Sequence, residues 1–340
     1  MTSFNAGKEY LGLQQLSRRV SNALHLRSRS AHNRELADMI KNGPSGRLPN
    51  LRRLKWPDYE GRMGPVLSEE NKKMVRPFSM QMSLDEREIV YSMLEDILSS
   101  AYRKSLGLCL IATGGSALGS FRHHDFIPWD DDFDLGLNKS CEGEFVQVLE
   151  SLQPELAFRR WAGWKIKVFR ADGMQTNIGN YSWNWPYIDI ALFETNATHR
   201  TEIPTSYNRQ YSYPLSGVFP LLYRPFGRLW LPTPFNIHEN LIVDYGPTDQ
   251  CYMSGYSHIL EGAGVSGKQP CRSLASKYAF VRRTLVGPIE GAEPKLVWVK
   301  ETLFLATDND SSSFKAIHSL ILPAHIATVT VEPFSLYQNL

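Results

Sequence analysis

The chain has 340 residues, of which 42% are hydrophobic and 21% are charged, which is the ordinary range for globular proteins. This composition excludes a collagen, a coiled-coil rod, a disulfide-rich miniprotein and a wholly disordered chain, and the length admits one large domain or two smaller ones. The formal net charge of +2 argues against a protein whose whole surface binds nucleic acid.

The charge is unevenly distributed along the chain. Residues 1–60 hold eleven Lys or Arg against five Asp or Glu, a net of +6, which leaves −4 for the remaining 280 residues. Residues 1–82 also mix Gly, Pro, Ser and Asn with little periodicity, so we predict a basic, largely irregular leader with a short helix around Arg34–Ile40. Such a leader is either simply solvated or lies on a membrane face or a glycan.

No membrane-spanning or export segment is expected from the hydropathy of this chain. It contains no run of 18 or more apolar residues, and its first thirty residues lack the apolar core of a signal peptide. The most apolar stretch, Ala316–Val331, is interrupted by His318, Pro323 and His325, so it predicts short strands rather than a membrane helix.

Four cysteines are too few for a disulfide scaffold and lack the C-x-x-C spacing of a metal site; they are Cys109, Cys141, Cys251 and Cys271. Cys109 lies in an apolar run and is expected to be a small buried hydrophobic residue. Cys251 and Cys271 flank a polar, Gly-rich segment and would pair in an oxidising compartment. Sequons for N-glycosylation begin at Asn138, Asn180, Asn196 and Asn309, a weak indication of a secretory lumen.

The most regular pattern in the chain begins at Ser83. Ser83 and Glu86 match a capping box, and apolar residues then repeat at helical spacing as far as Tyr102. Gly107 is placed to end this helix. The apolar run Leu108–Thr113 that follows predicts a buried strand.

The next elements alternate between strand and helix patterns. Phe133, Leu135 and Leu137 alternate with acidic or small residues, which is typical of a half-buried strand. Further patterns predict a helix over Glu144–Leu152, a hairpin over Phe158–Arg170 that turns at Ala162 and Gly163, and an apolar strand over Pro186–Phe193. No elements are assigned to residues 250–340.

Three acidic residues on two predicted strands point to a metal site. Asp132 and Asp134 face the same way because strand side chains repeat every two residues, and Asp189 is the one charge in its apolar strand. A carboxylate in a buried strand is costly without a partner, and hard oxygen ligands favour Mg²⁺ or Mn²⁺. A pair of such ions would stabilise the attacking and departing oxygens of a phosphoryl displacement.

A glycine-rich turn stands between the first strand and these acids. Gly114 and Gly115 let the backbone approach a ligand closely, and amides at the start of a following helix bind phosphate oxygens. Ser116 would add a hydroxyl to a phosphate or to a metal-bound water.

Each of these features also has an ordinary structural explanation. Gly-Gly-Ser alone is most often a turn. Asp130 and Asp131 fit a solvated loop or an Asx turn, and Asp189 alone fits a buried acid held by backbone amides. The order of the motifs, with these strands between them, favours the metal site.

The same residues resemble a known family. Residues 114–135, GGSALGSFRHHDFIPWDDDFDL, are similar to the signature of the LicD family, which includes fukutin and fukutin-related protein. Residues 185–190, WPYIDI, resemble a later element of that family, and a third match runs from Phe219 to Gly246. Together the matches cover Leu108–Gly246.

The resemblance implies an α+β fold of nucleotidyltransferase type, a mixed sheet with flanking helices, over residues 83–249. Residues 1–82 would then be the irregular leader and residues 250–340 a C-terminal extension of unknown role. It maps the family's metal-binding acids onto Asp132, Asp134 and Asp189, with Asp130 as an extra contributor. The implied activity is transfer of phosphocholine or ribitol phosphate from a CDP-linked donor to a glycan or glycoprotein hydroxyl.

Other residues of the matched blocks have candidate roles beside ordinary ones. Arg122 is placed to meet a diphosphate or is a surface arginine, and Trp129 stacks on the cytosine or braces the metal strand. Lys165 and Lys167 line the donor phosphates or form a solvated face.

Two further sets of side chains are expected to be structural. His123 and His124 would point apart on an extended chain, which argues against a shared zinc ion. A cluster of tryptophans is a sugar platform or, by default, core: Trp161, Trp164, Trp183 and Trp185.

Two alternatives to phosphoalcohol transfer remain open at this stage. One is nucleotidyl transfer by the same metal site, which the acidic body of the chain disfavours for a nucleic acid acceptor. The other is a non-catalytic scaffold that binds a glycan or a partner enzyme. By resemblance we expect a Golgi or secretory lumen, with the cytoplasm as the alternative because no anchor is found in the sequence.

Overall fold

The computed structural model describes residues 48–59, 76–172, 176–178, 181–203, 211–289, 295–307 and 313–330. The helix predicted around Arg34–Ile40 and most of the leader lie outside these residues. No helix in the described part of the chain is long and apolar enough to cross a membrane.

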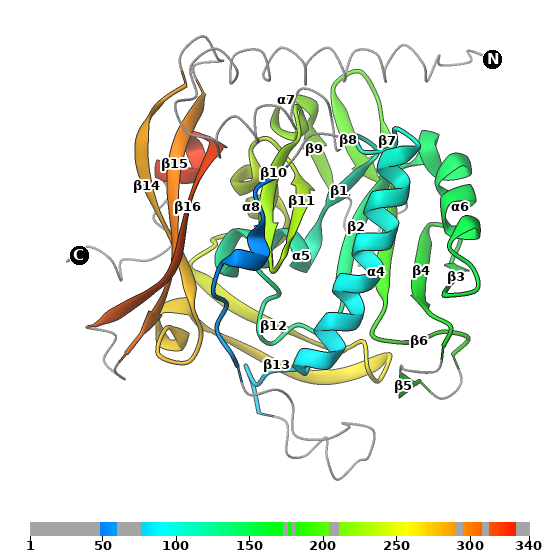
Figure 1. Cartoon of the computed structure of the whole chain (residues 1–340), viewed down its shortest axis with the longest axis horizontal. Helices are drawn as coiled ribbons and strands as arrows, with labels where there is room; N and C mark the ends of the chain where they lie inside the picture. The colour runs from blue at the N-terminus through cyan, green and yellow to red at the C-terminus, as the bar shows by residue number, and fades with distance from the viewer. Residues whose placement is uncertain are drawn as a thin grey trace.

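A mixed sheet forms the centre of the molecule (Figure 1). Its strands are β1 (Leu110–Ala112), β2 (Phe133–Asn138), β7 (Ile188–Thr195), β4 (Lys165–Arg170) and β3 (Leu156–Trp161), in that spatial order. β8 (His199–Glu202) pairs with the end of β7, and β9 (Ser212–Pro214) pairs with β8. β2 and β7 run parallel and the other pairs are antiparallel. The sheet confirms the predicted α+β fold with its mixed sheet.

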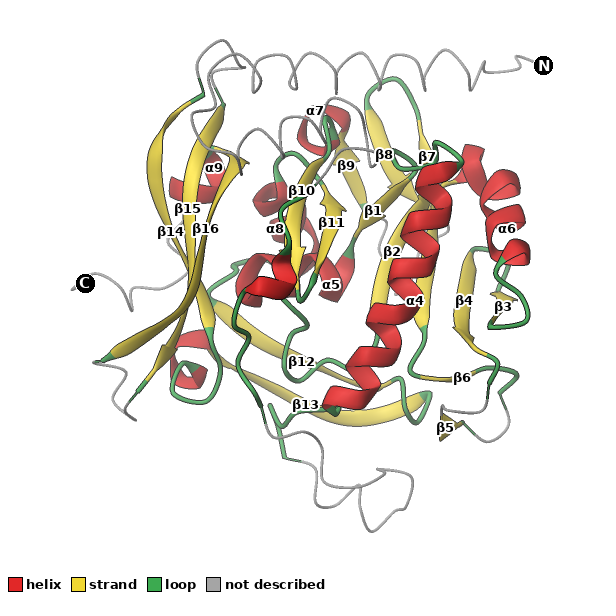
Figure 2. Cartoon of the chain, viewed as in Figure 1, coloured by secondary structure: helices red, strands yellow, loops and turns green. Residues whose placement is uncertain are grey.

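Helices flank this sheet where the sequence pattern places them (Figure 2). α4 (Leu84–Arg103) crosses in front of the sheet, and its capping box between Ser83 and Glu86 is formed. It ends at Arg103 rather than near Gly107, because Ser105 adopts a positive φ of 62° and turns the chain there. α5 (Gly114–His123) joins β1 to β2, and α6 (Glu142–Ser151) follows β2.

Further short elements surround the central sheet. They are the β10–β11 hairpin (Leu222–Phe226, Leu229–Thr233), the β12–β13 hairpin (Gln250–Ser257, Gly262–Pro270), the strands β5 (Thr176–Asn177) and β6 (Asn184–Trp185), and the helices α7 (Leu215–Val218) and α8 (Ile237–Tyr245). Single 3₁₀ turns are η2 (Leu51–Arg53), η3 (Lys139–Cys141) and η5 (Cys271–Leu274).

The C-terminal region forms its own antiparallel sheet. Its strands are β14 (Phe280–Pro288), β15 (Leu296–Ala306) and β16 (Phe314–His325), followed by α9 (Ala327–Thr330). The strand structure predicted within Ala316–Val331 is confirmed, but one long strand rather than several short ones occupies most of that stretch. Pro323 is tolerated there because β16 is an edge strand, which needs hydrogen bonds on one side only.

A buried ionic cluster attaches this sheet to the central part of the molecule. Glu301 of β15 receives hydrogen bonds from Arg224 of β10 at 2.6 and 2.8 Å and from Arg283 of β14 at 2.7 Å. His124, directly after α5, lies 2.8 Å from the same carboxylate. Burial alone would raise the pKa of Glu301, but Arg224 and Arg283 hold it well below its usual range.

All four cysteines are paired. Cys251–Cys271 forms as predicted, across the ends of the β12–β13 hairpin. Cys109 is buried as expected, yet it is not a free apolar side chain, since it forms a disulfide with Cys141. The antiparallel pairing of β1 with β2 explains this, because the amide of Asn138 donates to the carbonyl of Cys109 and η3 then brings Cys141 beside it.

Candidate active site

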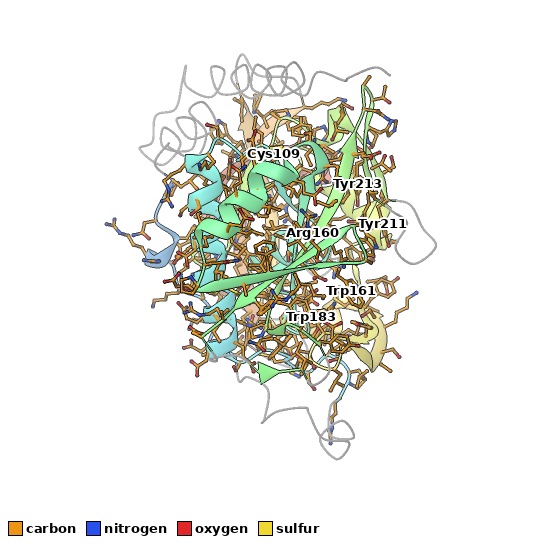
Figure 3. The ribbon with its side chains drawn as sticks, turned by 90° about the vertical axis from the view of Figure 1, so that its right-hand side faces the viewer. Cys109, Arg160, Trp161, Trp183, Tyr211 and Tyr213 are labelled. Atoms are coloured by element: carbon orange, nitrogen blue, oxygen red, sulfur yellow. A yellow bond between two sulfur atoms is a disulfide. The ribbon has the colours of Figure 1, made fainter. Side chains whose placement is uncertain are left out.

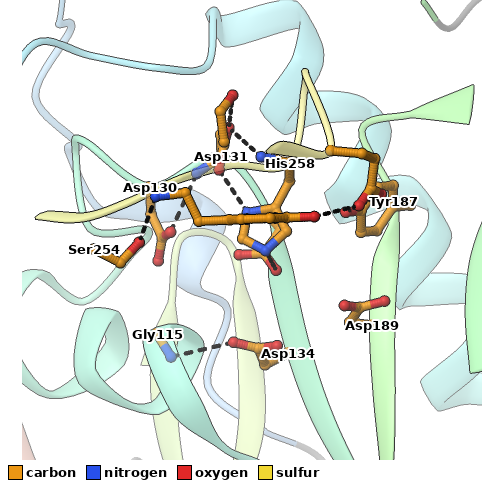
Figure 4. Close-up of polar contacts among 12 residues, drawn as sticks. Gly115, Asp130, Asp131, Asp134, Tyr187, Asp189, Ser254 and His258 are labelled. Carbon is orange, nitrogen blue, oxygen red and sulfur yellow. Dashed lines mark hydrogen bonds and ion pairs between the residues drawn. The ribbon is translucent and has the colours of Figure 1, made fainter. Parts of the chain in front are cut away.

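Three carboxylates meet at the start of two parallel strands. The β2–β7 register sets Asp134 directly beside Asp189, and Asp132 precedes Asp134 by two residues on the same side. One oxygen of each carboxylate lies within 4.8 Å of the others. Figure 4 shows Asp134 and Asp189 facing the same space. The structure thus brings together the three acids singled out in the sequence.

Burial and mutual repulsion shape the ionisation of this group. Burial raises the pKa of Asp132 and of Asp134, and the neighbouring carboxylates add to the effect. Burial would also raise the pKa of Asp189, but Lys165 and Lys167 lower it below its ordinary value. Their ammonium nitrogens lie 3.1 and 3.0 Å from the two oxygens of Asp189.

The donor set fits a hard divalent cation. It consists of three carboxylates, whose oxygens are the ligands that Mg²⁺ and Mn²⁺ prefer. The raised pKa values of Asp132 and Asp134 mean that their negative charges are incompletely compensated, which a bound cation would correct. Asp130 belongs to neither of the acidic groups in the described residues that have metal-site spacing. Its pKa is raised to about 7 by burial and by Asp131 and Asp134.

The predicted glycine turn lies directly against these acids, at the first residues of α5. A Cβ atom on Gly114 would lie 2.6 Å from Asp134 Oδ2, and one on Gly115 would lie 2.3 Å from Asp130 Oδ2. The amide of Gly115 donates to Asp134 Oδ2 at 3.2 Å. Ser116 is buried, and its Oγ accepts the amide of Asp134 at 2.7 Å, so it fixes the start of β2. Only glycine leaves room for the acids at this helix start.

A cavity of about 650 Å³ opens in front of the carboxylates. Its walls include Gly114, Gly115, Asp130, Asp132, Asp134, Arg122, Trp129 and Lys165 from the matched blocks, and Tyr252, Tyr256 and His258 from the β12–β13 hairpin. The cavity is therefore shared between the central sheet and a segment beyond residue 249.

Two of the predicted binding residues in this wall are tied to the β12–β13 hairpin. Arg122 is 2% exposed and donates from Nη2 to the carbonyl of Gln250 at 2.7 Å. Burial lowers its pKa to about 10. Trp129 donates from Nε1 to the carbonyl of Tyr252 at 2.9 Å and packs edge-on against Phe78. The tryptophan thus braces the wall of the cavity, which is the structural alternative weighed from the sequence.

The two lysines are not a solvated face. Lys165 lines the cavity, whereas Lys167 is 3% exposed and lies 3.7 Å from the centroid of the Tyr187 ring. Both pair with Asp189 because they alternate along β4, which is hydrogen-bonded to β7. Lys167 is also 3.3 Å from Glu261.

Asp131, assigned to a solvated loop or an Asx turn, is buried. It accepts hydrogen bonds from Ser257 Oγ, from the amides of His258 and Ile259 and from the His258 ring. The other ring nitrogen of His258 lies 3.1 Å from Asp132 Oδ2. Burial alone would lower the pKa of His258, but Asp132 and Asp131 raise it to about 10. His258 is not predicted from the sequence, because it lies in a segment whose hydrophobic and polar residues follow no regular period.

The histidine pair and the tryptophans have structural contacts. His123 ends α5 and bonds the carbonyl of Ala279 at 2.8 Å, while His124 turns away in a left-handed conformation towards Glu301, so the two diverge although the chain is not extended. Trp185 is fully buried, and its Nε1 donates to the carbonyl of Asp131. Figure 3 shows Trp161 beside Trp183, with ring centroids 5.2 Å apart.

Comparisons with known proteins agree with the resemblance seen in the motifs. The family model described as "LicD/FKTN/FKRP, nucleotidyltransferase domain" matches residues 107–236. The ribitol 5-phosphate transferases FKRP of Mus musculus and Homo sapiens are each 28% identical to this chain over 141 residues. That match covers 39% of this chain and 27% of either relative.

A solved structure of ANT(2")-Ia in complex with adenylyl-2"-tobramycin matches with a TM-score of 0.29 and 15% identity, over 42% of this chain and 67% of that one. The segment matched by the family model contains β1, α5, β2 and β7, and with them the glycine turn and the three carboxylates. Residues 107–236 are therefore similar to the nucleotidyltransferase domain of the LicD family.

Proposed function

We propose that this chain transfers a phosphorylated alcohol, of the phosphocholine or ribitol phosphate type, from a CDP-linked donor to a hydroxyl of a glycan or glycoprotein. The observation that carries the proposal is the meeting of Asp132, Asp134 and Asp189 beside the start of α5, at a cavity that Asp132 and Asp134 line. The partial similarity to enzymes named ribitol 5-phosphate transferase supports the class of substrate.

The roles of the chain's residues follow from their positions. Asp132, Asp134 and Asp189 would hold Mg²⁺ or Mn²⁺, which when bound neutralises charge on the donor diphosphate and on the leaving phosphate. Gly114 and Gly115 let the carboxylates of Asp134 and Asp130 lie close to the α5 N-terminus, where the helix dipole would favour the negative charge of the diphosphate.

Lys165 supplies a positive charge in the cavity wall, next to Asp189. It is the cationic side chain that we expect to contact the donor phosphates, because it lines the cavity whereas Lys167 is enclosed behind it. A lysine ammonium binds phosphate oxygens as a compact charge with three donors.

The reaction is an in-line displacement at phosphorus. The acceptor oxygen attacks the phosphorus that bears the alcohol, its proton passes to a carboxylate of the cavity, and the bond from that phosphorus to the bridging oxygen breaks. CMP leaves with the bonding electron pair, and the alcohol phosphate remains on the acceptor. In nucleotidyl transfer, by contrast, the nucleotide would remain on the acceptor.

The test is a mass-spectrometric screen of CDP-alcohols for metal-dependent release of CMP, with Asp134→Asn as the inactive variant. We expect its turnover to fall by at least about 100-fold, since even partners behind metal ligands are worth 10- to 100-fold. Asp96→Asn, an exposed aspartate of α4, is the matched control and should retain activity. Unchanged turnover by Asp134→Asn overturns the proposal.

We further propose a secretory compartment as the place of action. Both disulfides support it, because disulfides persist in oxidising compartments and are rare in the cytosol. A Golgi lumen suits a glycan acceptor.

A further inference from the structure

We propose that the turn between β12 and β13, residues 258–261, supports the metal site. His258 positions Asp132, and Glu261 balances the positive charge of Lys167, which pairs with Asp189. This turn lies outside the segment matched by the family model. The inference rests on the proposed cation at Asp132, Asp134 and Asp189, and it assigns a function to the C-terminal extension.

The first half of the turn holds Asp132 through a histidine. His258 faces a carboxylate at each ring nitrogen, with Nδ1 2.7 Å from Asp131 Oδ1 and Nε2 3.1 Å from Asp132 Oδ2. Both nitrogens face acceptors, so both act as donors, as in an imidazolium ring. The contact to Oδ2 fixes the orientation of Asp132 and leaves its other oxygen for a cation.

Asp131 orients the histidine and is not itself a ligand. Its two oxygens accept four hydrogen bonds, from Ser257 Oγ at 3.2 Å, the His258 amide at 2.9 Å, the Ile259 amide at 3.3 Å and the His258 ring. Four donors use the lone pairs that a carboxylate offers. The spacing of Asp131, Asp132 and His258 would suit a metal ion, but these contacts make it a positioning group instead.

The second half of the turn reaches Asp189 through Lys167. Glu261 accepts hydrogen bonds from Tyr187 Oη at 2.7 Å and Trp183 Nε1 at 2.8 Å, and it lies 3.3 Å from Lys167 Nζ. Lys167 in turn lies 3.0 Å from Asp189 Oδ1. The turn of residues 258–261 therefore holds Asp132 through His258 and Asp189 through Lys167.

The charges show why these contacts matter for a cation. His258 pairs with Asp131 as well as Asp132, and Lys167 with Glu261 as well as Asp189, so each positive charge is shared between a carboxylate of the site and one outside it. Among the described residues, Lys165 has no ion pair other than that with Asp189. The three carboxylates therefore outnumber the cationic side chains that pair with them alone, which favours a bound cation.

The test measures Mn²⁺ binding to the full chain directly, by electron paramagnetic resonance, alongside the thermal unfolding midpoint and the kinetics. We expect His258→Gln to weaken Mn²⁺ binding by about 10- to 100-fold, the usual effect of removing a partner behind a metal ligand. His199→Gln, at an exposed histidine of β8, is the matched control and should bind Mn²⁺ like the unmodified chain.

Normal Mn²⁺ affinity in folded His258→Gln overturns the inference. If that variant is unfolded at the assay temperature, Glu261→Gln decides, because it too should weaken Mn²⁺ binding by leaving Lys167 uncompensated beside Asp189. Normal affinity there is equally contrary to the inference.

The inference and the proposed function fail separately. Mn²⁺ binding that depends on His258 without CMP release from any CDP-alcohol would overturn the function and support the inference. The opposite result is CMP release that is lost in Asp134→Asn, with Mn²⁺ binding unchanged in His258→Gln and Glu261→Gln. It would support the function and overturn the inference.

Discussion

Gly115, the second residue of α5, lies at a point where a side chain has no room. A Cβ atom there would lie 2.3 Å from Asp130 Oδ2 and 3.8 Å from Asp134 Oδ2, closer to the first oxygen than any ordinary contact. Its φ is not in the left-handed region, so an alanine at this position is excluded by contact rather than by backbone strain. A substitution of Gly115 therefore tests whether the space in front of the carboxylates is needed, without changing a charge.

We expect Gly115→Ala to displace the Asp130 carboxylate into the cavity and to lower turnover of the CDP-alcohol by about 100-fold, the effect of a misplacement near 1 Å. Steady-state kinetics with the donor varied would measure it. Gly143→Ala is the control, since a Cβ there meets nothing within 4 Å, and it should leave turnover unchanged. Equal activity in both variants would show that this space is not used by the substrate.

The acids that the sequence predicted and the histidine that it missed differ in sequence context. Asp134 and Asp189 lie in apolar strands, where a charge is conspicuous and the strand period fixes its side, and Asp132 precedes Asp134 by two residues. His258 lies in a turn of a polar hairpin, and its partner Asp131 is more than a hundred residues away. A charged residue in an apolar strand can be recognised from the sequence alone. A contact between two polar loops that are far apart in the sequence leaves no such signal.

At the scale of elements, the central sheet was predicted from the sequence and most of the C-terminal sheet was not. α4, β2 and β7 were predicted because each is buried on one or both faces and its apolar residues follow the period of the element. β14, β15 and β16 carry polar and charged residues along both faces, so no period stands out. Their position depends on side chains that meet elements far away in the chain.

Glu301 makes the most concentrated of these contacts. It is fully buried on β15 and receives hydrogen bonds from Arg224 and Arg283, so it joins the C-terminal sheet to β10 and to the end of α5. Loss of its charge would leave two guanidinium groups buried without a carboxylate. Removing one member of a buried ion pair costs more than the pair itself contributes.

We therefore expect Glu301→Gln to lower the free energy of unfolding by about 3–5 kcal/mol. Chemical denaturation at pH 7 would measure it. Glu150→Gln, at an exposed glutamate of α6, should change the same quantity by less than about 0.5 kcal/mol. A similar small effect in both variants would mean that the ionic cluster does not hold the C-terminal sheet in place.

At the scale of the whole molecule, the covalent bonds between distant segments bear on where the protein works. Cys109–Cys141 joins β1 to the turn after β2, and Cys251–Cys271 closes the hairpin that carries His258. The second bond thus constrains a wall of the cavity. A protein that depends on it belongs in a compartment where disulfides persist.

The sequons provide an independent measure of the same property. Asn196 is exposed in the turn between β7 and β8, where its Oδ1 accepts the amides of Thr198 and His199 at 2.8 Å. Asn138 is half-buried and donates from Nδ2 to Thr195 Oγ1, so its amide is engaged within the protein. Of these two described sites, Asn196 is the one that a glycosylating enzyme can reach.

We expect that a thiol-blocking reagent added during isolation of the endogenous protein will label none of the four cysteines, because all of them are in disulfides. We also expect a glycan on Asn196, and peptide mass spectrometry would measure both. Asn196→Gln should abolish that glycan, whereas Thr198→Ser, which preserves the sequon, should retain it. Reaction of all four cysteines with the blocking reagent before reduction, together with an unmodified Asn196, would place the protein in a reducing compartment instead. The Cys251–Cys271 bond would then be absent in the cell, and His258 would be held in place by its contacts with Asp131 and Asp132 without that bond.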